Sequence, residues 1–183
     1  MIYNFHHFYY WLKGGVETGQ AYRAKLFRRL GLDAKFIFAT TFPEKNIQQE
    51  TSYLGFLDSE VIWMYGFFTD CRISPVTYTL EQLEDTFEEK KYTVSKDGGI
   101  LTYGFAQSAV TLKAFLEEGK DDLVHRVEMI SGGCLVRKDY YTYCRIYSEY
   151  YVPIDGHAHL YLRRFFSGIQ QPVREFIENT VVL

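Results

Sequence analysis

The first forty residues combine two short apolar runs with one longer segment of helical pattern. Residues 1–6 and 34–40 are typical of strands, and the second run is almost continuously apolar, as buried parallel strands are. Between them, residues 16–30 are mostly good helix formers and end at Gly31, where a left-handed helix cap is expected. Because Gly14-Gly15 joins the first strand to this helix, the pattern predicts a β-α-β unit.

Two further helices are expected before residue 74. Pro43 can open a short helix that continues to Leu54 and stops at Gly55. Asp58 or Ser59 can cap a second helix. The apolar residues that recur at helical spacing in this second segment are Val61, Ile62, Tyr65 and Phe68.

The pattern changes at Ser74-Pro75 to one of strands and tight turns. Thr79 and Gln82 have the spacing of a capping box, so a brief helix is expected before the strands begin. Gly98-Gly99, Gly132-Gly133 and Asp155-Gly156 then separate apolar or aromatic runs, which is typical of β-hairpins. The expected strands are 92–94, 100–103, 109–116, 123–130, 134–152 and 157–166. Consecutive hairpins predict an antiparallel meander of six or seven strands.

The predicted fold class is α/β plus antiparallel β, in two parts. Residues 1–74 are expected to form the first part of an amino-terminal Rossmann-like half, and residues 75–183 a short helix followed by an inserted β-meander. A parallel sheet of only two strands cannot bury both faces or cover its edges. Residues 176–183 also stop in the pattern of a strand, so we expect the chain to be a fragment of a longer protein.

Composition narrows the class of protein. Of the 183 residues, 47% are hydrophobic and 18% aromatic, which argues against a disordered chain and favours extended sheet. The formal net charge of −3 argues against a nucleic-acid-binding protein. No apolar stretch is long enough to span a bilayer, and the start lacks the pattern of a signal peptide. Cys71, Cys134 and Cys144 are expected to be thiols in a reducing compartment, so we expect a cytoplasmic protein.

The glycine turn is the first candidate site. In open α/β folds such a turn lies at the carboxyl edge of the sheet, where the free N–H groups and dipole of a helix start suit a phosphate. The alternative is that Gly14 and Gly15 only let the chain reverse between strand and helix. The dinucleotide fingerprint G-x-G-x-x-G is absent, so the turn alone leaves both interpretations open.

Other candidate sites are weaker. His6-His7 and the pair His157 and His159 lack a third ligand at a sensible spacing, so no metal site is expected. No nucleophile elbow of the form G-x-S-x-G occurs. The tyrosine-rich stretch 140–151 could be a peptide-binding platform or one sheet face packed on the core. The basic residues of the first helix could touch an anionic membrane surface or lie on a solvated face; they are Arg23, Lys25, Arg28 and Arg29.

Several longer motifs resemble one protein family. They are Gly15-Val16-Glu17, residues 20–25, residues 34–38, residues 61–70 (V-I-W-x-Y-x-F-F-T-D) and residues 137–141 (R-K-D-Y-Y). In these motifs the chain is similar to the amino end of the catalytic subunit of the accessory Sec-system glycosyltransferase. That family transfers N-acetylglucosamine from UDP-GlcNAc to serine or threonine of serine-rich repeat adhesins. The resemblance runs from Ile2 to at least Phe166.

The resemblance implies a retaining GT-B enzyme with two Rossmann-like halves and a β-meander inserted in the first. It implies that the meander engages a non-catalytic partner subunit and helps to hold the acceptor. The glycine turn would lie by the UDP diphosphate, and residue by residue this gives Gly15, Val16, Glu17 and Thr18. No cofactor is implied, because UDP-GlcNAc is the donor substrate. The family's catalytic residues fall beyond Leu183, so the chain alone is expected to have none and to be inactive.

The sequence departs from the family in one place. Relatives have a small, glycine-containing loop before the tryptophan that corresponds to Trp11, whereas this chain has the bulky residues 6–10, His-His-Phe-Tyr-Tyr. Gly14 also stands where relatives often have serine.

Two hypotheses of different class follow. The first is the amino-terminal part of a GT-B protein O-glycosyltransferase, cytoplasmic or peripheral at the inner face of the cell membrane. The second is a non-catalytic module whose meander docks a partner subunit or an adhesin peptide. A nucleotide-binding oxidoreductase domain is disfavoured by the missing fingerprint and by the meander.

Overall fold

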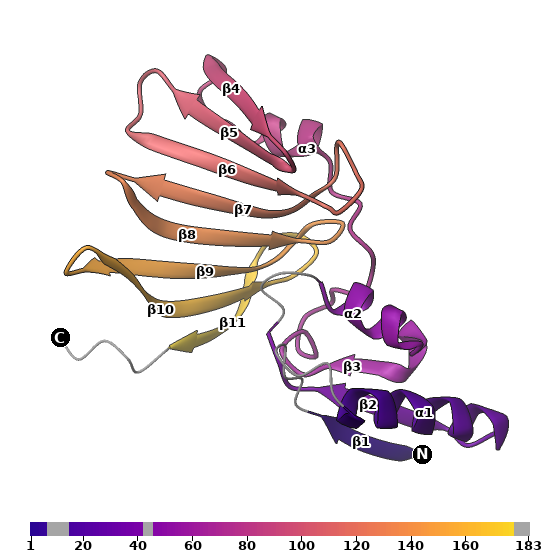
Figure 1. The fold of residues 1–183 in the computed structure, drawn as a ribbon. Helices are drawn as coiled ribbons and strands as arrows, with labels where there is room; N and C mark the ends of the chain where they lie inside the picture. The colour runs from indigo at the N-terminus through magenta and orange to yellow at the C-terminus, as the bar shows by residue number, and fades with distance from the viewer. Residues whose placement is uncertain (7–14, 42–45, 178–183) are drawn as a thin grey trace. The chain divides into compact units, whose positions relative to one another are not determined.

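A computed structural model describes residues 1–6, 15–41 and 46–177. They form two compact units, Met1–Pro75 and Val76–Leu183 (Figure 1). Each unit has its own sheet, a parallel one in the first and an antiparallel one in the second.

The first unit is built on a parallel sheet of order β1-β2-β3. Ile2 of β1 is in register with Ala34 of β2, and Phe36 of β2 with Val61 of β3. The predicted β-α-β unit is therefore confirmed. Its elements are β1 (Ile2–His6), α1 (Gly15–Arg29), β2 (Ala34–Phe38), α2 (Ile47–Leu54), the 3-10 turn η1 (Asp58–Glu60) and β3 (Val61–Trp63).

Helix α2 begins later than the sequence pattern suggested. Its N-cap is Asn46, whose side chain accepts a hydrogen bond from the Gln49 amide at 2.9 Å, while the Gln49 side chain accepts one from the Asn46 amide at 3.3 Å. This reciprocal capping box satisfies two amides that have no partner inside the helix. Pro43, the predicted start, lies outside the described residues. The predicted end is confirmed, because Gly55 has a left-handed φ of 92°.

The helix expected after Asp58 is wrong. Asp58–Glu60 make a single 3-10 turn, and Val61–Trp63 form β3, the third strand of the parallel sheet. The spacing of apolar residues did suit a helix, but Val61 and Ile62 are β-branched and gain a full ladder of hydrogen bonds beside β2. The parallel sheet therefore has three strands instead of the expected two.

Aromatic rings fill the space beside this sheet. Phe36 and Phe38 of β2 are fully buried, and the Phe56 ring contacts both edge to face, at centroid distances of 5.0 and 5.4 Å. Helix α1 contributes the small residues Ala21 and Ala24, which let its backbone approach closely. The middle of α1 therefore packs within the first unit.

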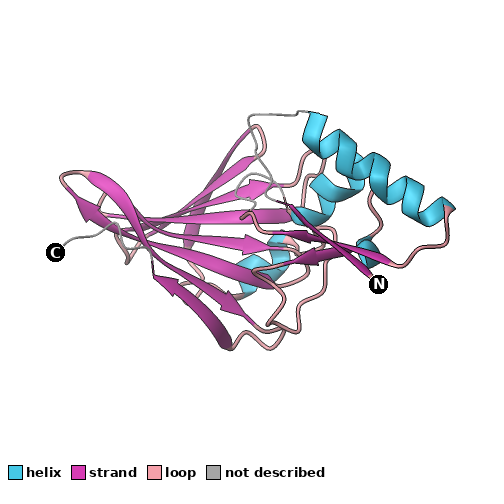
Figure 2. Cartoon of the chain, turned by 90° about the horizontal axis from the view of Figure 1, so that it is seen from below, coloured by secondary structure: helices cyan, strands magenta, loops and turns pink. Residues whose placement is uncertain are grey.

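The second unit is an eight-stranded antiparallel meander in which every strand pairs with its neighbours in the chain (Figure 1). The predicted meander is confirmed, with eight strands instead of six or seven. Figure 2 shows how the direction of the strands changes steadily across the sheet. The strands are β4 (Tyr92–Asp97), β5 (Ile100–Phe105), β6 (Val110–Leu116), β7 (Val124–Ser131), β8 (Cys134–Tyr141), β9 (Arg145–Ile154), β10 (His157–Phe166) and β11 (Pro172–Ile177).

Two-residue turns set the register of the central hairpins. Gly132 and Gly133 have φ values of 56° and 81°, and Asp155 and Gly156 have 51° and 77°. Two successive positive φ values give the type I′ turn that matches the twist of paired strands, and aspartate tolerates this conformation better than most residues. These two predicted hairpins are confirmed, as is the one predicted at Gly98-Gly99.

The long strand expected over residues 134–152 is wrong. It is two strands, β8 and β9, joined by a turn at residues 142–144. The turn is held from outside, because the Thr142 carbonyl accepts hydrogen bonds from the amides of Thr77 and Tyr78, both at 2.9 Å. Tyr141 and Tyr147 therefore lie on different strands and not at alternate positions of one.

The short helix α3 (Leu80–Asp85) covers one face of the large sheet. Thr79 and Gln82 form the predicted capping box, with hydrogen bonds of 2.9 and 3.1 Å, which is therefore confirmed. Leu83 and Phe87 pack against the centres of β5 and β6, and the Tyr103 hydroxyl donates to Glu84 at 2.8 Å. Leu83 and Phe87 thus form an apolar core with one face of the sheet, while Tyr140, Tyr147 and Phe165 are buried on the other face.

Gly66 offers a test of packing in the first unit. A methyl group at Gly66 would lie 2.8 Å from Cε3 of Trp63, which is too close for two carbon atoms. We expect Gly66→Ala to lower the free energy of unfolding by about 1–3 kcal/mol. The control is Gly19→Ala in α1, where the added methyl meets open space and is expected to be neutral or stabilising. Denaturant titrations followed by tryptophan fluorescence measure both, and equal stabilities for wild type and Gly66→Ala would contradict the packing argument.

Candidate functional site

The four predicted phosphate-binding residues make up the first turn of α1. Gly15 is the first helical residue, and Gly15, Val16 and Thr18 are exposed. Glu17 is buried, with 4% of its surface exposed. The first amides of a helix have no intrahelical acceptor, and in open α/β folds this end lies at the carboxyl edge of the sheet. The arrangement is chemically suited to an anion.

Within the described part of the chain, nothing restricts position 15 to glycine. Gly15 is outside the left-handed φ region, and a methyl group built there meets no described atom within 4 Å. A backbone conformation that only glycine tolerates is therefore not the reason for a glycine here.

An exposed aromatic turn follows β3, and no functional role was predicted for it. Phe67 and Phe68 are 63% and 59% exposed, and their rings meet edge to face at 5.3 Å. Trp63 supports the turn from below, since its indole N–H donates to the Thr40 carbonyl at 2.8 Å. In the sequence this turn corresponds to the aromatic run Trp-Met-Tyr-Gly-Phe-Phe, whose apolar spacing predicts a helix.

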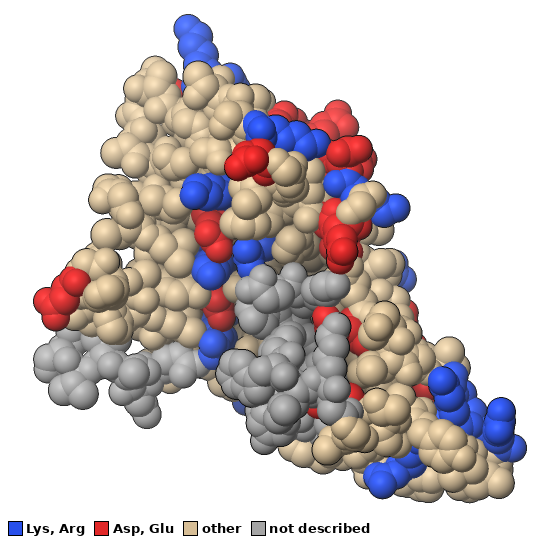
Figure 3. Space-filling model, viewed as in Figure 1, with Lys and Arg blue, Asp and Glu red and all other residues tan. Residues whose placement is uncertain are grey.

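One face of the large sheet carries a ladder of alternating charges. Figure 3 shows acidic and basic side chains alternating down the sheet. Strand register places five charged residues directly opposite one another on β6 to β10, namely Lys113, Glu128, Lys138, Glu149 and Arg163. Lys138 lies 3.3 Å from Glu128, and Arg163 lies 2.9 Å from Glu149. Directly opposed charges of unlike sign stabilise an antiparallel pair, so this face favours the observed register.

Glu149 is the most heavily bonded member of this charge ladder. It is 5% exposed, and its carboxylate accepts hydrogen bonds from the hydroxyls of Tyr140 and Tyr151 at 2.8 and 2.7 Å and from Arg163. Burial raises the pKa of the Tyr140 and Tyr151 phenols, with the Glu149 carboxylate acting in the same direction. Both phenols therefore remain neutral donors.

The tyrosine-rich stretch 140–151 is mainly packed inside. Tyr140 and Tyr147 stack face to face at 4.2 Å, and both are buried, as is Tyr141. Of the two interpretations left open by the sequence, the packed sheet face holds for these three residues. Tyr150 and Tyr151 are half-buried.

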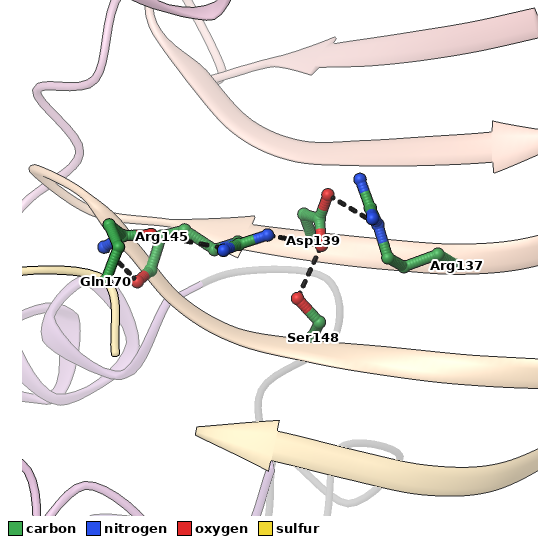
Figure 4. A network of polar contacts seen from close by, with 5 residues as sticks. All are labelled: Arg137, Asp139, Arg145, Ser148 and Gln170. Atoms are coloured by element: carbon green, nitrogen blue, oxygen red, sulfur yellow. Dashed lines mark hydrogen bonds and ion pairs between the residues drawn. The ribbon is translucent and has the colours of Figure 1, made fainter. Parts of the chain in front are cut away.

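The opposite face of the large sheet contains a groove of about 920 Å³. The linker between α3 and β4 and the turn between β5 and β6 form its walls. Its floor is apolar and is made by Phe105, Leu112, Val127 and Met129. Arg137 and Asp139 line the groove as well, with their charged groups joined at 3.0 Å (Figure 4). Nothing in the sequence indicated this groove, because its lining comes from five separate segments.

The remaining candidate residues lie on several elements, and His7 is outside the described residues. His157 and His159 lie on β10, and no group of three potential metal ligands occurs within residues 1–6, 15–41 and 46–177. Cys71, Cys134 and Cys144 are thiols. No helix among those residues could cross a membrane. Within the basic cluster of α1, Arg28 binds Glu60 at 3.1 Å and the Gly55 carbonyl at 2.8 Å, which reduces the charge available to a membrane surface.

One family model matches the second unit. Residues 93–168, which extend from β4 to just beyond β10, match the family described as the GtfA extended beta-sheet domain. The match takes in seven of the eight strands of the meander.

Longer similarities then identify the relatives of the whole chain. It is 42% identical over 167 residues to the UDP-N-acetylglucosamine--peptide N-acetylglucosaminyltransferase GtfA subunit of Streptococcus agalactiae, covering 91% of this chain and 33% of that protein. Among solved structures, the GtfA/B complex has a TM-score of 0.91 at 38% identity, over 98% of this chain and 36% of that one. The pneumococcal O-GlcNAc transferase GtfA with UDP and GlcNAc has a TM-score of 0.90 at 38% identity, over 98% and 35%. The chain is thus similar to GtfA subunits and spans about a third of the length of the curated relatives that it matches.

The three hydrogen bonds to the buried Glu149 carboxylate lead to a prediction about stability. Glu149→Gln removes the charge that three donors share in a buried position, and we expect it to lower the free energy of unfolding by about 2–3 kcal/mol. The matched control is Glu175→Gln, because Glu175 pairs with Arg164 at 2.6 Å at an exposed site, where loss of the pair costs less than about 1 kcal/mol. Urea titrations compare the two variants. Equal losses of unfolding free energy in the two variants would show that the buried interactions of Glu149 contribute no more than the exposed pair of Glu175.

Proposed function

We propose that this chain forms part of a retaining GT-B glycosyltransferase that transfers N-acetylglucosamine from UDP-GlcNAc to serine or threonine of a polypeptide. The observation that carries the proposal is the similarity to proteins named as such transferases, at 42% identity over 91% of the chain. The chain covers only about a third of those proteins, so the activity belongs to the longer polypeptide.

The first unit supports assignment to the start of a Rossmann-like GT-B half. It has three parallel strands, with α1 and α2 in the connections between them. Tyr3 and Phe5 of the edge strand β1 are largely exposed, whereas parallel sheets of α/β proteins are covered on both faces. Further strands and helices of the same half would supply this cover.

The start of α1 is proposed to hold part of the diphosphate of the donor. Gly15, Val16, Glu17 and Thr18 offer backbone amides at a helix start, which is the chemistry that a diphosphate requires. UDP-GlcNAc is consumed as a substrate, so the proposal involves no cofactor. The groups that act on the sugar are proposed to lie in a second half, outside this chain.

The meander is proposed to contact other proteins. A related structure is solved as a GtfA/B complex, which suggests a non-catalytic partner subunit, and the proposed acceptor is a serine-rich repeat protein. The proposed location is the cytoplasm, with a peripheral contact at the membrane. A second candidate function is a binding module that docks such partners without catalysis, and it is favoured by the match of residues 93–168 to a sheet domain alone.

Activity is the first test of the proposed function. A polypeptide of the length of the relatives that contains this chain is expected to transfer N-acetylglucosamine from UDP-GlcNAc to a serine-rich acceptor peptide. The 183-residue chain alone is expected to show no transfer above a buffer control, because it lacks the proposed second half. Radiolabelled donor measures both. Transfer by the chain alone would contradict the proposal that the groups acting on the sugar lie outside it. Absence of transfer by the longer folded protein would favour the binding module.

The second test concerns the diphosphate site. In the longer protein, Gly15→Val places a branched side chain at the helix start and is expected to weaken UDP binding at least about tenfold, or ~1.4 kcal/mol. Calorimetry with UDP measures the change.

The control is Gly19→Val, one turn further along α1. Both glycines have open space at the added Cβ, so the two variants are expected to disturb the fold of the unit to a similar extent. Only Gly15 belongs to the first turn. Unchanged UDP affinity in a folded Gly15→Val protein would mean that the turn merely connects strand and helix.

A further inference from the structure

The turn that follows β3 presents two aromatic rings to solvent on a fixed support. Phe67 and Phe68 are 63% and 59% exposed, and their rings meet edge to face. Two hydrogen bonds close the backbone of this turn, from the Gly66 amide to the Trp63 carbonyl at 3.1 Å and from the Thr69 amide to the Gly66 carbonyl at 3.0 Å. Water solvates phenyl rings poorly, so two rings held out on a fixed turn favour contact with another molecule.

Trp63 fastens this turn to the neighbouring strand. Its indole N–H donates to the Thr40 carbonyl at 2.8 Å, and the Met64 amide donates to the Phe38 carbonyl at 2.9 Å. Gly66 lies so close to the indole that an added methyl group would be 2.8 Å from Cε3. Phe38 is the last residue of β2, so the turn is bound to the carboxyl ends of two adjacent strands.

The proposed diphosphate site lies at the same edge of the parallel sheet. Helix α1 connects two parallel strands, so it runs back against them. The chain has returned to the amino edge by Asp33, whose carbonyl accepts from the Ile2 amide at 2.8 Å. The 15 residues of α1 span about 22 Å, whereas the five residues of β1 span about 17 Å. The start of α1 at Gly15 therefore lies at the carboxyl edge, where β3 also ends (Figure 1).

The spacing of the strands sets the distance between the two features. Because β2 lies between β1 and β3, the ends of these two strands are about 10 Å apart. In the proposed reaction the acceptor oxygen replaces the diphosphate on the sugar carbon, releasing UDP and the hydroxyl proton, and it starts about 3–3.5 Å from that carbon. An extended polypeptide advances about 3.3–3.6 Å per residue. A side chain two or three residues from the attacking serine or threonine therefore reaches the rings.

We infer that Phe67 and Phe68 bind an apolar side chain of the acceptor polypeptide, two or three residues from the serine or threonine that is modified. Aromatic rings offer a large contact area and have few rotatable bonds to immobilise. Further elements of the same half would cover the faces and the outer edge of the sheet, whereas ligands of open α/β sheets bind outside the carboxyl ends of the strands. The inference rests on the proposed transferase function and adds the acceptor position that the first unit recognises.

The test compares two capped acceptor peptides, Gly-Val-Val-Gly-Ser-Gly-Val-Val-Gly and the same peptide with glutamine in place of every valine. Glutamine is polar and no smaller than valine, so the peptides differ mainly in apolar surface near the serine. Transfer from radiolabelled UDP-GlcNAc by the longer protein gives kcat/KM for each peptide. We expect kcat/KM to be at least about fivefold higher for the valine peptide, because a valine side chain is partly removed from water. This comparison requires no variant.

Variants then assign the preference to the two rings. The double variant Phe67→Ala with Phe68→Ala is expected to lose the preference for the valine peptide and to keep its affinity for UDP, measured by calorimetry. The matched control is Tyr53→Ala, which is expected to keep the preference. Tyr53 is 80% exposed in the last turn of α2, which runs back to the amino edge of the sheet. Tryptophan fluorescence reports whether each variant is folded.

Two results would overturn the inference and leave the proposed function intact. The first is equal kcat/KM values for the two peptides in a protein that glycosylates the serine-rich acceptor peptide. The second is a full preference for the valine peptide in the folded double variant. Absence of transfer to every acceptor, the serine-rich peptide included, would instead contradict the proposed function and the inference that rests on it.

Discussion

Pairing of charges across strands is the interaction on which the large sheet depends. The sheet is a single layer, and α3 covers part of only one face. On the other face, register places Lys113, Glu128, Lys138, Glu149 and Arg163 opposite one another, beside a buried stack of Tyr140, Tyr147 and Phe165. A slip of one residue would turn a strand over and separate these partners. The charge pairs and the aromatic stack therefore depend on the same register.

The two faces use buried carboxylates in different ways. Glu149 is bonded by two tyrosines and one arginine, so its charge is matched locally. Asp139, one strand away on the opposite face, is shared by Arg137 and Arg145 and accepts a hydrogen bond from Ser148. Adjacent strands of the same meander thus bury one carboxylate on each face, and each carboxylate has its own set of partners.

Local signals in the sequence were sufficient for most of the fold. The capping box of Thr79 and Gln82 and the turns at Gly132 and Asp155 depend on neighbours in the chain, and these were predicted correctly. Errors occurred where distant contacts decide. Val61–Trp63 become a strand because β2 offers a partner, and the chain turns at Thr142 because the backbone of residues 77 and 78 binds there. The start of α1 was assigned from a motif, whereas the groove unites residues from Leu83 to Tyr141 that no local pattern connects.

The order of strands in the meander has a consequence for how the chain acquires its structure. Each strand pairs only with strands adjacent in the sequence, and most connections are short turns. Low sequence separation between contacting residues favours rapid folding, and hairpins can add one at a time as the polypeptide leaves the ribosome. The parallel sheet of the first unit has the opposite property, because its partners are separated by crossover helices. A meander of this topology can form without long-range pairing, so it can present an ordered surface before the slower parallel sheet is complete.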